Sequence, residues 1–96
     1  MPHYIILCNF TDQGIRNIKD TIKRAETFKA AVEKAGEKFV SLYYSLGKYD
    51  IVIIIEAPND ETMMSTILAA GSWGNVRTET LKAFTMDEAA KIIERL

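Results

Sequence analysis

Hydrophobic and polar positions repeat along this chain with two different periods, and these periods divide it into strands and helices. Four short segments are rich in β-branched and aromatic residues, which is typical of strands. They are residues 4–10, 39–46, 49–57 and 75–84. Two longer segments repeat apolar residues every three or four positions, as a helix with one buried side does. They begin near Asp20 and Asn59 and end near Gly36 and Gly71.

The order of these segments predicts the fold. The stretch from Ile51 to Ile55 is apolar at every position, so we expect a central strand that is covered on both sides. With right-handed crossovers, the order β-α-β-β-α-β gives a ferredoxin-like α+β fold with a four-stranded antiparallel sheet. Thr85 and Glu88 fit a capping box, which predicts a short additional helix at the C-terminal end. Ninety-six residues are the size of one domain, so we expect a single domain over residues 1–96.

The predicted helices carry apolar residues that we expect to be buried. Asp20 is suited to cap the first helix, because its carboxylate can accept a hydrogen bond from a first-turn amide. Ile22 and Phe28 belong to the apolar stripe of this helix, and Met63 and Met64 to that of the second.

Both helices must cover the same face of such a sheet, and the other face is then bare. A central strand with apolar residues on both sides would expose a large hydrophobic patch there. A second copy of the sheet, packed about 10 Å away, would cover it. We therefore expect a homodimer or higher homo-oligomer, a dimeric α/β barrel. The alternative is a monomer whose C-terminal helix folds back over the open face.

Composition and charge exclude several classes of function. The net charge is −1, from 12 basic and 13 acidic residues, so the chain offers little attraction for nucleic acid. No apolar run approaches the roughly 20 residues that a membrane span needs. Cys8 is the only cysteine and the start lacks a secretion signal, so we expect a cytoplasmic protein. One cysteine and one histidine provide no metal-ligand set, and we expect no metal and no cofactor.

The residues Gly47, Lys48, Tyr49 and Asp50 form a short motif between two predicted strands. At this point the chain resembles the GYD family, whose defining feature is a Gly-x-Tyr-Asp turn that opens a strand. Further stretches are similar to that family at the right distances, so the resemblance covers nearly the whole chain. They are residues 10–15, 23–26, 56–58 and 74–80. The resemblance implies a dimeric α/β barrel and a small cytoplasmic prokaryotic protein of unassigned function, without established catalytic residues.

Asp50 is the first candidate for chemistry. It begins an apolar strand beside Tyr49, and a partly buried carboxylate can have a raised pKa and act as a general base. Alternatively, its oxygens accept amides in the Gly47 turn and hold the hairpin. Arg24 could reach the hairpin and pair with Asp50, or it could make a surface or capping contact.

The last strand offers two sets of side chains, and alternation does not say which set faces a cavity. If Thr78 and Thr80 face it, they join the serine and tyrosine side of residues 39–46 as a lining for a small molecule. If Arg77 faces it, the guanidinium could hold a carboxylate or pair with Glu79 or Asp50, or it could form an ion pair between subunits. The candidate ligand-binding residues are Ser41, Tyr43, Tyr49, Asp50, Arg77, Thr78 and Thr80.

Three functions fit these patterns. The first is a homo-oligomeric module that binds a small metabolite in a cavity on the open sheet face; it rests on the polar and aromatic lining and the lack of a complete catalytic set. The second is a cofactor-independent enzyme, of isomerase or monooxygenase type, with an acid–base cluster of Asp50, Tyr49 and, as a further candidate, Arg77; it rests on analogy of fold and on these residues. The third is an interaction protein without a ligand.

Overall fold

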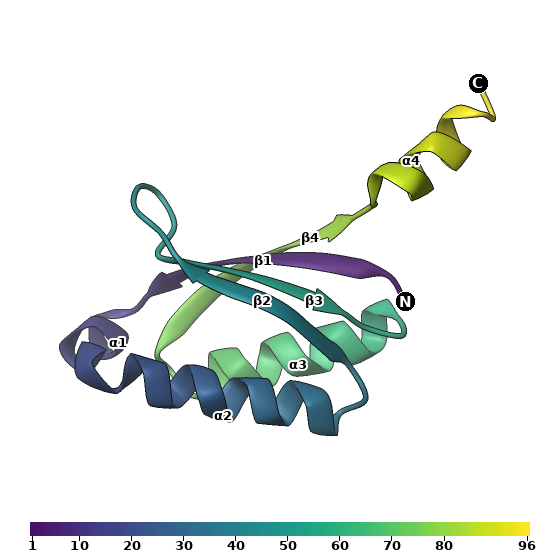
Figure 1. Cartoon of the computed structure of the whole chain (residues 1–96). Helices are drawn as coiled ribbons and strands as arrows, with labels where there is room; N and C mark the ends of the chain where they lie inside the picture. Colours follow the sequence, from purple (N-terminus) through teal and green to yellow (C-terminus); the bar gives the residue numbers. More distant parts are fainter.

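The order of helices and strands in the computed structural model, which describes residues 1–96, follows the predicted β-α-β-β-α-β plan. The strands are β1 (His3–Phe10), β2 (Lys38–Tyr44), β3 (Ile51–Glu56) and β4 (Val76–Ala83). The helices are α1 (Asp12–Arg16), α2 (Thr21–Lys34), α3 (Asp60–Ser72) and α4 (Met86–Ile93), with a 3-10 turn, η1 (Ile18–Asp20), between α1 and α2. The strands form one antiparallel sheet in the order β2-β3-β1-β4, so the ferredoxin-like α+β fold is confirmed (Figure 1).

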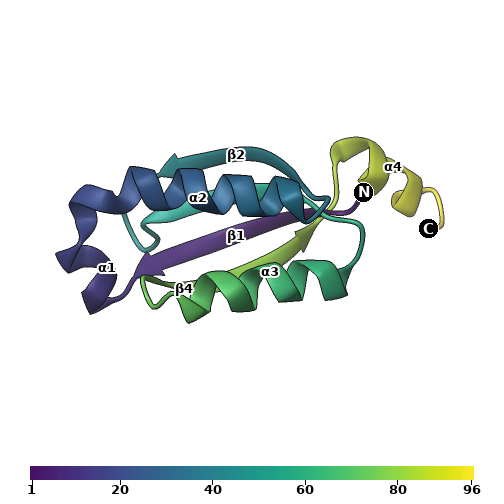
Figure 2. The same cartoon turned by 90° about the horizontal axis from the view of Figure 1, so that it is seen from below.

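Helices α2 and α3 lie side by side on one face of the sheet and form the second layer of the molecule (Figure 2). Every second residue of the two central strands points toward these helices and is buried. These core residues are Tyr4, Ile6, Cys8, Ile51, Ile53 and Ile55. They form one cluster with Phe28 and Val32 of α2 and with Met63 and Ala70 of α3. The period of two is what a strand covered on one side produces.

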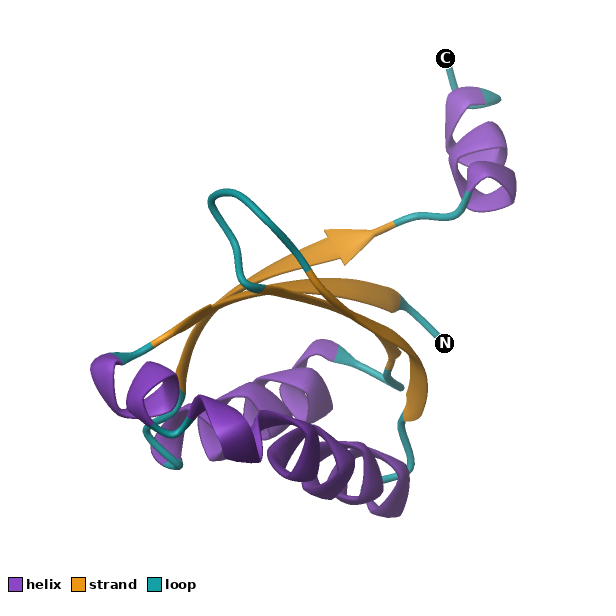
Figure 3. Cartoon of the chain, turned by 60° about the vertical axis from the view of Figure 1, so that its left-hand side comes forward, coloured by secondary structure: helices purple, strands orange, loops and turns teal.

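The other face of the sheet carries no helix (Figure 3). Leu7 of β1 lies opposite Val52 of β3 and Glu79 of β4, and directly opposite residues on neighbouring strands point to the same side. By the same register, the residues of this open face include Ile5, Leu7, Asn9, Ser41, Tyr43, Val52, Ile54, Arg77, Glu79 and Leu81. Its apolar members are only partly buried in the single chain, so the predicted bare face exists.

Helix α4 projects away from the body of the chain instead of covering the open face (Figures 1 and 3). The predicted capping box is present, with Thr85 and Glu88 each accepting a hydrogen bond from the other's amide. The helix contains no buried residue, and Met86 and Ile93 are 88% and 61% exposed. The alternative in which the C-terminal helix folds back over its own sheet is therefore wrong for this structure. None of the helices has the length and hydrophobicity that crossing a bilayer requires.

Helix α2 begins without the predicted side-chain cap. Asp20 occupies the N-cap position but accepts no amide hydrogen bond, because its backbone is turned at the end of η1 rather than extended as a capping residue usually is. Phe28 is buried as expected, whereas Ile22 is 57% exposed. The helix ends before Gly36, which has the φ of 83° that favours glycine after a helix.

Helix α3 differs from its prediction on one side and at its end. Asn59 caps it by accepting a first-turn amide at 2.8 Å. Met63 is buried, but Met64 is 59% exposed and lies outside the apolar stripe. The helix includes Gly71, and the turn into β4 is made by Gly74, whose φ is 83°.

Candidate functional site

The turn at residues 47–50 is tied to the end of the neighbouring strand β1. Gly47 has a φ of 102°, a conformation that glycine adopts without strain. The Oδ2 atom of Asp50 accepts a hydrogen bond from the Phe10 amide at 2.9 Å, and the Asp50 amide donates to the Cys8 carbonyl at 2.9 Å. Asp50 therefore holds the hairpin, as one of the two alternatives expected, but its partner lies in β1 rather than within the turn.

The side chain of Tyr49 links the same turn to β4 across the open face. Its hydroxyl donates a hydrogen bond to Oε2 of Glu79 at 2.6 Å. This hydrogen bond, together with desolvation, raises the pKa of the Tyr49 hydroxyl, so the phenol stays protonated near neutral pH. The Lys48 ammonium lies 5.6 Å from the centre of the Tyr49 ring, within the range of a cation–π contact.

Arg24 does not pair with Asp50, so of its two alternatives the ion pair is wrong and the capping contact is the one observed. Its guanidinium instead donates to the Asn17 carbonyl at 2.8 Å and to the Gly14 carbonyl at 3.4 Å. These contacts hold the α1–η1 segment against α2.

The two sets of side chains on β4 lie on opposite faces of the sheet. Arg77 is on the open face, and so are Ser41 and Tyr43, which lie opposite residues of β3 on that face. Thr78 and Thr80 lie opposite Cys8 and Ile6, so they are on the side of α2 and α3. The hypothesis that the threonines join Ser41 and Tyr43 in one lining is therefore wrong, because β4 presents them to the other layer.

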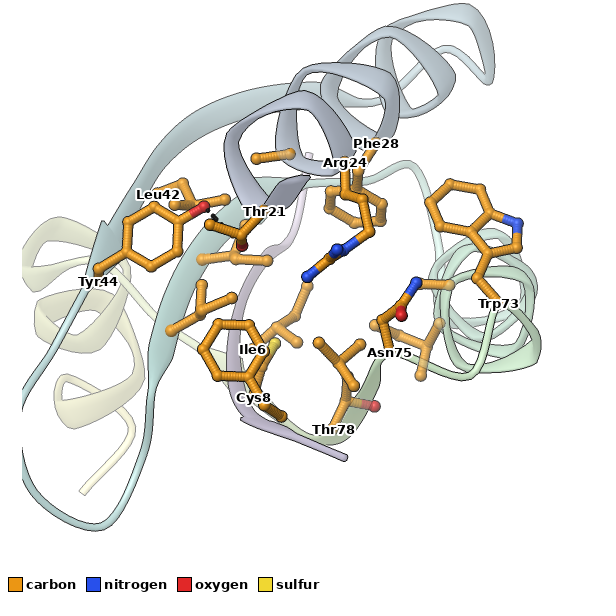
Figure 4. Close-up of a pocket in the computed structure, with 17 residues that line it drawn as sticks. Ile6, Cys8, Thr21, Arg24, Phe28, Leu42, Tyr44, Trp73, Asn75 and Thr78 are labelled. Carbon is orange, nitrogen blue, oxygen red and sulfur yellow. Dashed lines mark hydrogen bonds between the residues drawn. The ribbon is translucent and has the colours of Figure 1, made fainter. Parts of the chain in front are cut away.

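A cavity of about 70 Å³ lies between the sheet and the helices, on the opposite side of the sheet from the open face (Figure 4). Of the predicted ligand-binding residues, only Thr78 lines it. Its walls are mostly apolar, and Thr21 closes one side through a hydrogen bond of 3.1 Å to the Tyr44 hydroxyl. Arg24 reaches into this space from α2, and Trp73 and Asn75 line the same space (Figure 4). A wider surface hollow of about 290 Å³ shares these three residues and forms the outer part of the same region.

A signal for this site was present in the sequence. Arg24 precedes Phe28 by four residues, which places both on one side of a helix. Because Phe28 belongs to the buried stripe, Arg24 had to lie at its margin rather than on the solvent side. No three His, Cys, Asp or Glu side chains are grouped so that they could hold a metal ion.

The sequence profile of the GYD domain family matches residues 4–93. The chain belongs to the GYD domain family. It is also 33% identical, over 97 aligned positions, to a Thermus thermophilus protein named glutamine synthetase and cystathionine beta-lyase binding protein. The alignment covers 100% of this chain and 99% of that relative.

Solved structures with the same fold differ strongly in sequence from this GYD-family chain. A protein from Thermus thermophilus has a TM-score of 0.58 and 22% identity, over 88% of this chain and 95% of the other. The feast or famine regulatory protein of M. tuberculosis, complexed with L-methionine, has a TM-score of 0.68 and 14% identity. That alignment covers 90% of this chain but only 52% of the regulator, so this chain spans about half of its length. These similarities establish the ferredoxin-like fold alone.

Proposed function

We propose that this GYD-domain protein is a homo-oligomeric binding protein that docks on metabolic enzymes, with glutamine synthetase and cystathionine beta-lyase as the partners to test first. The observation that carries the proposal is the full-length similarity to a relative named for binding these two enzymes. Because the similarity extends over the whole length of both chains, a binding role is the function it supports.

Self-association would cover the apolar surface that the single chain leaves exposed on the open face. The centre of the open face is apolar, with Leu7, Val52 and Ile54 partly exposed, while charged residues such as Arg77 and Glu79 lie toward the β4 edge. An apolar centre with a charged rim is the usual composition of a protein interface. A second copy offers the same apolar centre and is therefore the partner we assign to this face.

The size of the sheet suggests that α4 takes part in the same contact. Four strands of six to eight residues span roughly 20 Å by 23 Å, about 450 Å². A stable interface buries about 800 Å² on each partner. Exposed apolar residues of α4 and of the link that precedes it would provide much of the difference by packing on the second copy; they are Phe84, Met86 and Ile93.

The small-metabolite hypothesis takes a specific form in such an assembly. Ser41, Tyr43 and Arg77 lie on the face that would meet the second copy, so a ligand cavity there would form between subunits. The enzyme hypothesis has less support, because the Asp50 carboxylate is engaged by a backbone amide and Tyr49 by Glu79.

Self-association is tested by light scattering and native mass spectrometry of wild type, Val52→Asp and Met64→Asp. The first variant places a charge at the centre of the open face, and the second places one on the exposed side of α3. We expect an oligomeric wild type, a folded monomer for Val52→Asp and an unchanged oligomer for Met64→Asp. A wild type that is monomeric at tens of micromolar concentration would overturn the self-association proposal.

Docking is tested separately by biolayer interferometry with glutamine synthetase and cystathionine beta-lyase purified from the same organism as this protein. Saturable binding to at least one enzyme, with no binding to an unrelated enzyme of similar charge, is expected. If neither enzyme binds, the docking proposal fails even where self-association stands.

A further inference from the structure

The cavity beneath α2 and α3 is not used by the proposed contacts between copies, because it lies on the opposite side of the sheet from the open face (Figures 2 and 4). Its deep part is lined by Ile6, Phe28, Ile67 and other apolar side chains. Cys8 also belongs to this lining, and burial raises the pKa of its thiol to about 12, so it adds neutral surface. The deep part therefore suits an apolar group.

The mouth of the cavity is positively charged. The guanidinium of Arg24 forms no ion pair within the chain, and only two of its five N–H groups reach backbone carbonyls. Lys23 lines the same outer hollow, which contains one acidic residue, Asp20. An arginine held in place by backbone contacts, with free donors beside an apolar cavity, is suited to bind a carboxylate.

A second donor lies beside Arg24. The side-chain oxygen of Asn75 accepts a hydrogen bond from Gln13 at 3.0 Å, which turns the amide nitrogen toward the cavity (Figure 4). That nitrogen donates no hydrogen bond within the chain, so it remains available to a ligand oxygen. Trp73 lies at the mouth and is 43% exposed, so its ring can cover a bound molecule.

The volume limits the size of the apolar group. An apolar cavity of about 150 Å³ holds the six carbon atoms of benzene. The whole cavity here, from the apolar end to Arg24 and Asn75, is about 70 Å³, roughly half of that. With the carboxylate placed in the outer hollow, it accommodates a tail of about three carbon atoms.

We propose that this cavity binds a short aliphatic carboxylate, with its tail among the apolar residues beneath α2 and its carboxylate on Arg24 and Asn75. The proposal concerns one chain and is independent of self-association and of enzyme docking. It also differs from the predicted site, because Thr78 is the only predicted ligand-binding residue that lines this cavity and none of the open-face residues does.

The probe for this site is butanoate, whose tail has three carbon atoms, titrated into the full-length protein at pH 7 and followed by ¹H–¹⁵N NMR. We expect saturable shifts at the Gly14 and Cys8 amides and at the Trp73 indole, with a dissociation constant on the order of 1 mM for so small a ligand. Butan-1-ol has the same tail without the charge and should bind at least tenfold more weakly. Equal affinity for the alcohol and the acid would overturn the proposal.

Two variants locate the binding groups. Arg24→Gln removes the charge and should weaken butanoate binding at least tenfold, whereas Arg16→Gln, the same change at an exposed residue outside the cavity, should not. Ala25→Leu keeps Arg24 but fills the cavity, and it should abolish the shifts at Cys8. Unchanged affinity in a folded Arg24→Gln protein would overturn the proposal. If Arg24→Gln does not fold, unchanged affinity in folded Ala25→Leu would do so.

Discussion

The two faces of the sheet are made from the same strands and differ in what completes them. On β3, Ile55 is fully buried beneath the helices, while its neighbour Ile54 points to the open face and is only partly buried. Both side chains are equally hydrophobic, so the difference comes from the chain order, which sends both crossover helices to one side. One face is thus part of the buried core, and the other is an apolar surface that a single chain leaves uncovered.

The largest expected effect on stability comes from truncating one isoleucine on each face of β3. Ile55→Ala leaves a cavity in the buried core and should lower the free energy of unfolding by about 3 kcal/mol. Ile54→Ala should cost less than about 1 kcal/mol in dilute protein, because little packing is lost from an uncovered face. Urea unfolding monitored by circular dichroism measures both.

The concentration dependence of this pair tests what covers the open face. If a second copy covers it, the cost of Ile54→Ala should increase at protein concentrations where wild type is oligomeric, while the cost of Ile55→Ala stays nearly constant. Equal costs for both variants in the monomeric protein would show that the two faces are equally well packed, and the comparison would fail.

A second pair of substitutions tests how tightly α1 packs against the start of β4, with a glycine in open space as the control. A Cβ atom at Gly14 would lie 2.1 Å from the Asn75 carbonyl oxygen, so Gly14→Ala must push α1 away from the start of β4. We expect a loss of about 2 to 3 kcal/mol. Gly71 lies inside α3 with no atom within 4 Å of an added Cβ, and Gly71→Ala should stabilise by about 0.5 to 1 kcal/mol. Thermal unfolding of both variants checks the contrast, and a stable Gly14→Ala protein would contradict it.

The sequence was sufficient for the strand order and for the existence of a bare face. Both follow from local signals: the apolar run at residues 51–55 and two helical periods between strands. The face toward which each β4 residue points was not predictable, because Arg77, Thr78, Glu79 and Thr80 alternate in chemistry but none is clearly a core residue. That choice depends on the register with β1, which is a contact between residues distant in the chain.

The cavity could not be predicted for a similar reason. Its walls come from all four strands and from α2 and α3, and the space arises because their side chains leave a gap that no local pattern encodes. The position of Arg24 could be inferred from its spacing to Phe28, but its partners could not. They are carbonyl oxygens of the irregular α1–η1 segment, and any residue type provides such an acceptor.

The turn that carries the family motif should contribute to stability through Asp50 more than through Tyr49. Asp50→Ala leaves the Phe10 amide without its acceptor and should cost about 1 to 2 kcal/mol. Asp50→Asn keeps an acceptor oxygen and should cost less. Tyr49→Phe removes a more exposed hydrogen bond to Glu79 and should cost less than about 1 kcal/mol. Chemical unfolding of the three variants gives this order. A larger loss for Tyr49→Phe than for Asp50→Ala would show that the contact across the open face is the stronger one.

The smallest effect involves a single buried carboxyl at the margin of the helix layer. Glu37 is 5% exposed, Thr66 donates a hydrogen bond of 2.8 Å to its Oε1 atom, and Oε2 has no partner. Desolvation raises the pKa of Glu37 above its ordinary value, although the Thr66 hydrogen bond opposes this.

The sign of the pH dependence follows from this pKa. Between the ordinary and the raised pKa, the folded protein binds more protons than the unfolded chain, so this carboxyl reduces stability as the pH rises through that interval. Glu37→Gln lacks the titration. The stability of wild type relative to Glu37→Gln should therefore be greatest near pH 4 and fall as the pH rises to 7, as measured by urea unfolding at each pH. Glu26→Gln, an exposed residue of α2, controls for the loss of one negative charge. A relative stability that instead rises with pH would mean that the carboxylate form of Glu37 is favoured by the fold, and that the helix layer tolerates a charge more readily than its packing implies.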